Sequence, residues 1–332
     1  MSEQYTQSYI YIEKEDSVEI LRCFSYDTKI EIPERIQGKP VRSIGAYAFS
    51  AHQDEQELTE GLRTGKYKKM RGSLFSDQQA HPACGEKLES VVLPESVQKI
   101  GAYCFYNCRN LREFSFTSNI SEWGRGAFTG CHHVRRLRYQ ELSGTCSCLK
   151  EVLSEFREEL LVEYCGESYA RLLFPEYYEE GVENTPARIL MTRVHGSGLY
   201  YRNCFQDRKF QFDEYDRRFD QAWPLEKEEF LLELVINRLR YPWGLTEKNR
   251  ERYEKWLAEE LLQAGIYAVE KKDLEEVLWV LEFGQKYPEK LKGCLSEWLQ
   301  RSNMVFAQAA SYLVEARRKL SPRRSNFQDF EL

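Results

Sequence analysis

The sequence lacks a surplus of positive charge and a long apolar run, and each lack excludes a class of function. Lys and Arg number 47 against 53 Asp and Glu, which gives a formal net charge of -6. A chain with this balance has no general attraction for nucleic acid or for an anionic membrane surface. No stretch approaches the roughly 18 to 20 continuous apolar residues that a membrane helix needs. We therefore expect no membrane span, and nucleic acid could be bound only by a local basic patch.

The sequence is also poor in motifs that carry chemistry. Neither GxxxxGK[ST] nor GxGxxG follows an expected strand, so phosphate binding is not indicated. The chain has five His, and the segment HGSG places His195 close to Ser197 without the strand, elbow and helix that make such a nucleophile reactive. We predict no catalytic residues, no cofactor and no small-molecule ligand. A hydrolytic or metal-dependent enzyme that uses this central segment remains the alternative.

One cluster has the residue types of a zinc site. Cys131, His132 and His133 are followed by Cys146 and Cys148, and Cys and His are the usual zinc ligands. The spacing matches no recognised zinc motif, however, and adjacent His side chains point in different directions. We predict no metal here.

The composition is that of a folded chain with more than one unit. Hydrophobic residues make up 42% of the 332 residues, with 21 Tyr and 18 Phe, which excludes global disorder. This length favours about two units at roughly 150 residues each. Ten Cys are spread along the chain and its first residues are polar and acidic, so we expect reduced thiols and a cytoplasmic location.

An internal repeat appears when Leu88–Phe105 is laid over Leu111–Phe128. The period is 128 minus 105, or 23 residues. In this register three apolar columns recur: Leu88, Leu111 and Val134; Val91, Phe114 and Leu137; and Leu93, Phe116 and Tyr139. The glycines, the Phe residues and the small Cys residues of the turn also align: Gly101 with Gly124, Phe105 with Phe128, and Cys108 with Cys131.

An earlier copy of the repeat lies at Ile30–Phe49, where Ile30 matches Val91 and Ile44 matches Ile100. We interpret the insertion that follows it, at about residues 51–85, as a long surface loop. The alternating apolar pairs predict strands that turn one face into a shared core. Because one copy cannot bury this face alone, successive copies must stack.

The segments IEIPERIQGKPVRSIGAYAF, LESVVLPESVQKIGAYCFYNC and ISEWGRGAFTGC resemble the BspA-like leucine-rich repeat family over roughly residues 8–140. This resemblance implies a solenoid of β-coils that binds a protein. The sequence departs from the repeat pattern at Trp123 and Thr117, which stand where the other copies have Ile and Pro.

The remainder of the chain reads as mainly helical. Apolar residues at helical spacing over 146–164 predict a helix that caps the repeat core, and residues 165–225 show no clean period. Helices are predicted for 226–241, for one long segment over 246–268 with Thr246 as its N-cap, and for a segment that Asp273 and Glu276 open as a capping box. Two further helices follow Pro288.

The paired helices around AVEKKDLEEVLWVLE look similar to ankyrin-like repeats, and an ordinary helical bundle fits the pattern equally well. The predicted fold class is α+β, a short leucine-rich-repeat solenoid followed by antiparallel helix pairs. The expected domains are a solenoid at 1–145, a capping helix and aromatic-rich segment at 146–225, a helical domain at 226–320 and a polar tail at 321–332.

The expected function is a non-catalytic scaffold that binds an unidentified protein. Outward residues of the predicted strands and an aromatic run are the candidate partner-binding residues: Ser90, Val92, Glu113, Ser115, Arg136, Arg138, Tyr177 and Tyr178. For any one of the strand residues, ordinary solvated surface is an equally good interpretation, and the rings of Tyr177 and Tyr178 could instead pack the two domains together. A nucleic-acid-associated factor that uses the basic clusters at 66–71, 135–138 and 317–324 is a further alternative.

Overall fold

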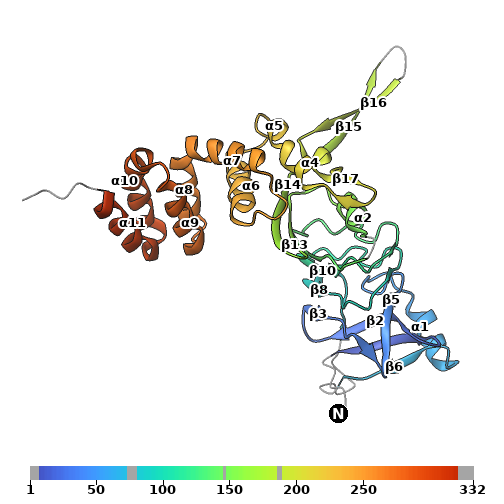
Figure 1. Cartoon of the computed structure of the whole chain (residues 1–332). Helices are drawn as coiled ribbons and strands as arrows, with labels where there is room; N and C mark the ends of the chain where they lie inside the picture. Colours follow the sequence, from blue (N-terminus) through green and yellow to red (C-terminus); the bar gives the residue numbers. More distant parts are fainter. Residues whose placement is uncertain (1–6, 73–80, 145–146, 185–188, 321–332) are drawn as a thin grey trace, which may run out of the picture. The chain divides into compact units, whose positions relative to one another are not determined.

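The computed structural model describes residues 7–72, 81–144, 147–184 and 189–320. The chain divides into two compact units, one of Met1–Glu226 with Tyr241–Gly244 and one of Lys227–Arg240 with Leu245–Leu332. Strands dominate the first unit, and the described part of the second consists of helices (Figure 1). The predicted α+β class is therefore confirmed.

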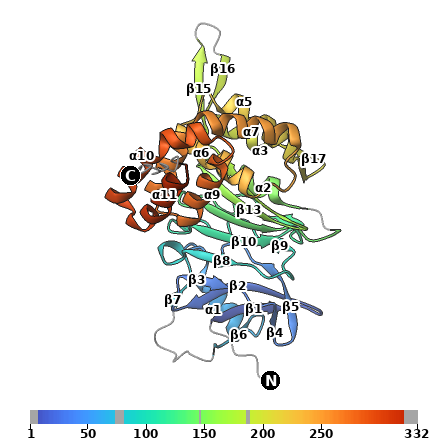
Figure 2. The ribbon, with the colours of Figure 1, turned by 60° about the vertical axis from the view of Figure 1, so that its left-hand side comes forward.

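The main sheet of the first unit carries the repeat. From β3 to β13 neighbouring strands run parallel, and β14 closes the sheet antiparallel to β13. Figure 2 shows β3, β8, β10 and β13 following one another along the unit. The strands, in their order across the sheet, are β14 (Tyr169–Phe174), β13 (Leu160–Cys165), β12 (Arg136–Gln140), β10 (Glu113–Thr117), β8 (Ser90–Val92) and β3 (Lys29–Glu31).

The backbone register reproduces the repeat alignment. Phe114 lies opposite Val91 on one side and Leu137 on the other, and Ile30 lies opposite Val91. All four side chains are buried. The 23-residue period and the earlier copy at Ile30 are therefore confirmed, because residues that align in sequence are neighbours in the sheet.

A second sheet forms another wall of the coils. Ile44, Ile100 and Trp123 lie side by side in parallel strands, as the alignment predicts. An antiparallel hairpin begins this sheet, and the second strand of the hairpin runs parallel to the strand of the first coil. Its strands are β11 (Glu122–Trp123), β9 (Lys99–Ile100), β5 (Lys39–Ile44), β2 (Val18–Ser25), β1 (Ser8–Glu13) and β6 (Lys68–Met70), with β4 (Arg35–Ile36) on β5 and β7 (His81–Pro82) on β2.

Aromatic rings and thiols fill the turn between the two sheets. Phe105 stacks on Phe49 and Phe128, with ring centroids 5.2 and 5.1 Å apart. The Cys131 thiol donates to the carbonyl of Phe105 at 3.0 Å, and the Cys108 thiol donates to that of Phe49 at 3.1 Å. Each repeat Cys therefore bonds to the Phe of the preceding coil, which gives a small interior side chain its polar contact.

The insertion after the first copy is structured, and the prediction of a surface loop is wrong for its described residues. It contains α1 (Glu55–Arg63), the strands β6 and β7, and the short 3-10 helix Gly85–Lys87. Leu58 and Tyr67 are buried in a cluster with Ile10 and Leu21 of the N-terminal hairpin. The insertion packs because it supplies apolar side chains of its own to that hairpin.

The predicted capping helix over 146–164 is also wrong in its extent. The helix α2 spans only Leu149–Ser154, and Leu160–Cys165 forms β13, which adds one more parallel strand to the sheet. Helical spacing at 149, 152, 153 and 156 and alternation at 160, 162 and 164 overlap in the sequence, so a single period cannot describe both. Residues 145 and 146 lie outside the described part.

The remaining elements of the first unit lie within residues 165–225, where the sequence shows no clean period. The strands β15 and β16 pair only with each other in their two-stranded sheet, as do β17 and β18. The elements are β15 (Tyr178–Asn184), β16 (Ile189–His195), α3 (Gly198–Arg202), β17 (Phe205–Gln206), β18 (Lys209–Phe210), α4 (Phe212–Arg217) and α5 (Phe219–Ala222).

The described part of the second unit consists of helices, which pack on consecutive helices and also on second neighbours along the chain. Contacts join α8 to α9 and α10, and α11 to α9 and α10. Pro288 opens α10, as predicted. The helices are α6 (Glu228–Arg240), α7 (Glu247–Glu259), α8 (Leu261–Glu270), α9 (Leu274–Gly284), α10 (Pro288–Val305) and α11 (Ala307–Leu320).

Two details of the helical prediction are corrected. The single helix expected over 246–268 is two helices that break at Glu260. Asp273 accepts from the backbone N–H of Glu276 at 3.0 Å, but the Glu276 carboxylate turns to Lys271 and Arg240 instead of completing the capping box. Thr246 occupies the N-cap position of α7 without a capping bond from its side chain.

Candidate interaction face

The exposed face of the main sheet carries the residues that the sequence singled out. In a strand the side chains alternate between faces, so the residues between the buried columns point outward. Ser115 lies opposite both Val92 and Arg138, and Glu113 lies opposite both Ser90 and Arg136. The structure therefore brings these six predicted residues together in two adjacent rows on one face.

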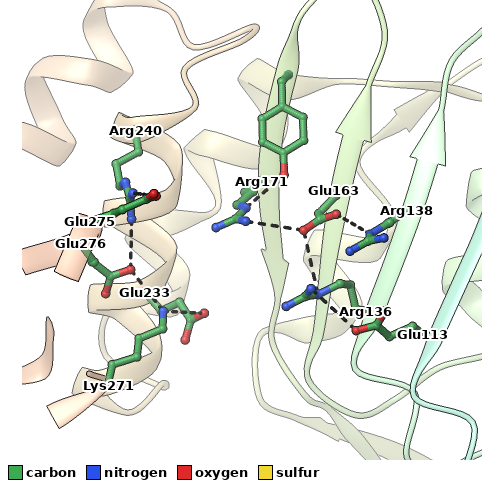
Figure 3. Close-up of polar contacts among 11 residues, drawn as sticks. Glu113, Arg136, Arg138, Glu163, Arg171, Glu233, Arg240, Lys271, Glu275 and Glu276 are labelled. Carbon is green, nitrogen blue, oxygen red and sulfur yellow. Dashed lines mark hydrogen bonds and ion pairs between the residues drawn. The ribbon is translucent and has the colours of Figure 1, made fainter. Parts of the chain in front are cut away.

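Two further strands extend the face with a charged cluster that the sequence analysis missed. Arg138 lies opposite Glu163 of β13, which in turn lies opposite Arg171 of β14. Figure 3 shows Glu163 between Arg138 and Arg171. The Glu163 carboxylate accepts from Nε of Arg138 at 2.9 Å and lies 3.6 Å from Arg171 and 4.0 Å from Arg136. We call Arg136, Arg138, Arg171 and Glu163 the arginine cluster.

The four members of the arginine cluster differ in depth. The Glu163 side chain is 10% exposed, whereas those of Arg138, Arg136 and Arg171 are 52%, 38% and 29% exposed. The carboxylate therefore lies beneath the guanidinium groups. Glu113 of β10 approaches Arg136 at 3.7 Å, so the three arginines share the carboxylates of Glu163 and Glu113.

Aromatic residues hold Arg171 in place. Its guanidinium lies 4.8 Å from the centre of the Tyr241 ring, and its Nε donates to the Tyr169 hydroxyl at 3.1 Å. Burial raises the pKa of Tyr169, although the hydrogen bond with Arg171 acts in the opposite direction. The hydroxyl stays neutral at physiological pH and can accept the bond from Arg171.

A sequence signal for Glu163 did exist. Leu160, Val162 and Tyr164 alternate in the way that Leu137 and Tyr139 do, at a spacing of 25 instead of 23 residues. The changed spacing and the overlapping helical pattern concealed this extra strand. Arg171 has no counterpart in the repeat, because β14 runs antiparallel to it.

The two aromatic candidates lie in different environments. Tyr177 is buried, with Arg157 and Arg202 over its ring. This burial removes its side chain from the surface and counts against the predicted role. Tyr178 is exposed and stacks on His195, with centroids 4.4 Å apart.

The helical unit has a charged cluster of its own, also drawn in Figure 3. Glu276 is buried, and its carboxylate lies 3.3 Å from Lys271 and 3.4 Å from Arg240. Burial raises the pKa of Glu276, and Lys271 opposes this shift. Lys271 also pairs with Glu233 at 3.3 Å. These contacts join α6, α8 and α9, and we assign them a structural role.

His195 and Ser197 of the HGSG segment do not form a catalytic pair. Ser197 is fully buried, and its hydroxyl donates to Glu226 at 2.6 Å. His195 contacts Glu180 at 2.9 Å through Nε2. A serine nucleophile needs an accessible oxygen, and the buried Ser197 hydroxyl does not offer one.

The residues considered for zinc have separate contacts. Cys131 bonds to the Phe105 carbonyl, His132 to Glu158 at 3.0 Å and His133 to the Arg109 carbonyl at 2.6 Å. In the described ranges, no group of three His, Cys, Asp or Glu side chains is arranged to hold a metal. Cys146 lies outside those ranges.

The three basic clusters considered for nucleic-acid binding have different surroundings in the structure. In the segment 66–71, Lys68 pairs with Glu13. In the segment 135–138, Arg136 and Arg138 belong to the arginine cluster. The cluster at 317–324 begins in α11 and continues beyond the described residues.

Comparison with known proteins supports the repeat. Residues 77–147 match a family model described as a BspA type leucine rich repeat region. The repeat is of the BspA leucine-rich type. This confirms the predicted resemblance for that segment, where β8, β10 and β12 provide three successive strands of the ladder.

Two solved structures are similar to parts of the chain. A leucine rich cell surface protein from Faecalibacterium prausnitzii is 16% identical, with a TM-score of 0.25, and the match covers 52% of this chain and 57% of that one. A leucine rich repeat protein from T. pallidum is 20% identical, with a TM-score of 0.20, and the match covers 39% of this chain and 68% of that one. No curated protein matches the sequence. In the part of the chain that the structure describes, no helix is long and apolar enough to span a bilayer.

Proposed function

We propose that the chain is a non-catalytic protein-binding module whose docking surface is the exposed face of the repeat sheet. The main observation in support of this proposal is that the outward residues of five neighbouring strands lie in register on one face. These strands are β8, β10, β12, β13 and β14. In this proposal the coils form a short solenoid that acts as a rigid support. A rigid surface loses little conformational entropy of its own when a partner binds.

The composition of the face also supports this proposal. Arginine and tyrosine are enriched at protein interfaces, and Arg171 lies between Tyr169 and Tyr241. Arg138 and Arg136 are held by ion pairs to Glu163. Side chains that are ordered before binding lose less freedom when a partner docks.

A steric block at the centre of the face tests the proposal. Ser115 is half-buried and lies between Val92 and Arg138, so Ser115→Trp adds a large ring to the middle of the row. A protein captured by the full chain from lysate is identified and purified, and its Kd is measured by calorimetry. We expect Ser115→Trp to weaken binding by at least about tenfold.

Ser121→Trp is the matched control, because Ser121 is exposed at the turn before β11, on the other wall of the coil. This variant should bind as the original chain does. Equal affinity for both variants contradicts the use of the sheet face, even if the chain binds the partner elsewhere.

The location of the chain stays part of the proposal. We propose a cytoplasmic protein with reduced thiols, supported by the free state of the nine cysteines that the structure describes. Cell fractionation with a thiol-trapping reagent tests it, and oxidised chain at the cell surface would contradict it. The ankyrin-like or plain bundle arrangement of the helical unit also remains a proposal, as do the antiparallel helix pairs and the domain boundaries predicted from the sequence.

A further inference from the structure

The arginine cluster points to the chemistry of the partner, and this inference rests on the proposed function. We propose that the face binds an extended protein segment that carries acidic side chains at alternate positions. The segment lies over Arg136, Arg138 and Arg171.

The sign of the local charge supports an acidic partner. Three guanidinium groups share two carboxylates, those of Glu163 and Glu113, on a chain whose formal net charge is -6. A carboxylate offers about four lone-pair sites, whereas each arginine has five N–H donors. The two carboxylates can therefore orient the three arginines but cannot accept from all of their N–H groups.

The arginine side chains are more exposed than Glu163, so the N–H groups without a carboxylate partner lie toward solvent. The side chain of Arg138 is half exposed and that of Arg136 is partly exposed, whereas the side chain of Glu163 is 10% exposed. An approaching acidic side chain therefore meets the arginines first. Arginine binds carboxylates in a bidentate geometry with charge-assisted hydrogen bonds.

The spacing of the cluster favours an extended segment. Residues rise about 3.3 Å along a strand and strands lie about 4.8 Å apart. Arg136 and Arg138 are two residues apart on β12, so their backbones are separated by about 7 Å. Side chains on one face of an extended peptide repeat at the same distance, about 7 Å. Acidic residues at alternate positions can therefore reach both arginines at once.

Three peptides test this inference by fluorescence polarisation with the full chain. The first alternates glutamate and serine, the second has the same composition with its glutamates contiguous, and the third alternates lysine and serine. We expect the alternating acidic peptide to bind most tightly. Arg138→Gln should weaken that binding about tenfold, because it removes one charge-assisted pair.

Arg125→Gln is the matched control. Arg125 is exposed just after β11 on another wall of the coil, where it lies over the Tyr103 ring. The substitution removes the same charge from the chain and should leave peptide affinity unchanged within about twofold. Arg138 is half exposed, and circular dichroism of both variants verifies that the fold is intact.

Several results would overturn the inference. One is equal affinity for the alternating and contiguous peptides, and another is no effect of Arg138→Gln. A third is equally tight, Arg138-dependent binding of a single-stranded oligonucleotide, which would show a general polyanion site. If Ser115→Trp abolishes binding of the identified partner while Arg138→Gln leaves it intact, the acidic segment is excluded but the docking face stands.

Discussion

The repeat coils and the helical unit stabilise their interiors through different contacts. In the coils, backbone groups of one coil bond directly to the next, as when the N–H of Phe105 donates to the carbonyl of Ala127 at 2.9 Å. In the helical unit the helices satisfy their own backbone groups, and neighbours meet through side chains. Trp298 covers Gly265 and donates to the Leu262 carbonyl at 2.9 Å. The coils therefore depend on backbone proximity, and the helices depend on side-chain fit.

The largest expected effect comes from forcing two coils apart. A Cβ at Gly124 would lie 2.3 Å from the carbonyl carbon of Gly101 and 2.4 Å from the backbone N of Ala102. Backbone atoms cannot move aside singly, so Gly124→Ala should destabilise the coils by about 3 kcal/mol or more. Hydrogen exchange measured by mass spectrometry should show lost protection in β9 to β12.

Gly181→Ala is the control for this substitution. A Cβ at Gly181 meets nothing within 4 Å, so the protection of the coils should not change. If Gly124→Ala also leaves the hydrogen-exchange protection of the coils unchanged, close backbone contact does not determine the stability of the coil stack.

The second effect concerns the end of the coil stack. There the Glu155 carboxylate supplies the hydrogen-bond acceptors that a further coil would otherwise supply. Its carboxylate accepts from the indole N–H of Trp123 at 2.6 Å and from the backbone N–H groups of Phe128 at 2.8 Å and Ala127 at 3.2 Å. Glu155→Ala leaves these donors without their acceptor and should cost about 3 kcal/mol. Denaturant unfolding followed by Trp fluorescence measures this loss.

Glu151→Ala is the comparison for Glu155→Ala. Glu151 forms a partly exposed ion pair with Arg208, and such a pair contributes no more than about 1 kcal/mol. Equal destabilisation by the two substitutions would contradict a special role for Glu155 at the coil end.

The third effect probes side-chain fit in the helical unit. A Cβ at Gly265 would lie 1.8 Å from the Trp298 ring. This ring is a side chain and can turn, so Gly265→Ala should destabilise the helices by about 2 kcal/mol, less than Gly124→Ala destabilises the coils. Gly293→Ala in α10, where a Cβ meets nothing within 4 Å, should be neutral or stabilising by up to about 1 kcal/mol. Thermal unfolding of the original chain and of Gly265→Ala, Gly293→Ala and Gly124→Ala ranks these effects. A Gly265→Ala loss larger than that of Gly124→Ala would reverse the comparison.

The smallest expected effect is a pH dependence of the unfolding free energy that arises from Glu155 in the coils. Burial raises the pKa of Glu155, although its hydrogen bonds act in the opposite direction. The folded state therefore binds more protons than the unfolded state just above the ordinary Glu pKa of about 4.3. The contribution of this group to stability is present below that pH and is lost as the pH rises through the folded-state pKa. The pH slope of the unfolding free energy should become flatter in Glu155→Gln, and an unchanged slope would contradict this assignment.

The repeat could be predicted closely because its signal is local and recurs. Val91, Phe114 and Leu137 each need only their own strand and turn to be identified, and the recurrence fixes which residues become neighbours. Leu160–Cys165 escaped prediction because its spacing differs and a helical period overlaps it. In the helical unit, apolar periodicity predicted helices correctly but not the break at Glu260, which interrupts a continuous apolar pattern.

Six of the eight candidate partner-binding residues lie together on one face, since alternation along a strand determines which side chains point outward. Tyr177 could not be assigned in this way. Whether its ring is exposed depends on Arg157 and Arg202, which lie 20 residues before it and 25 residues after it. The docking role of the face and the location of the chain remain predictions.

The amino-acid sequence alone was sufficient for the repeat period, the apolar columns, the outward rows and the existence of the helices. These follow from spacing along the chain, which is a local property. The tertiary structure decided the rest: that the insertion packs on the N-terminal hairpin, that Glu155 ends one wall of the coils and that Arg136, Arg138 and Arg171 meet around Glu163. Each of these depends on groups from separate segments, whose mutual contacts are created only when burial of the shared core brings those segments together.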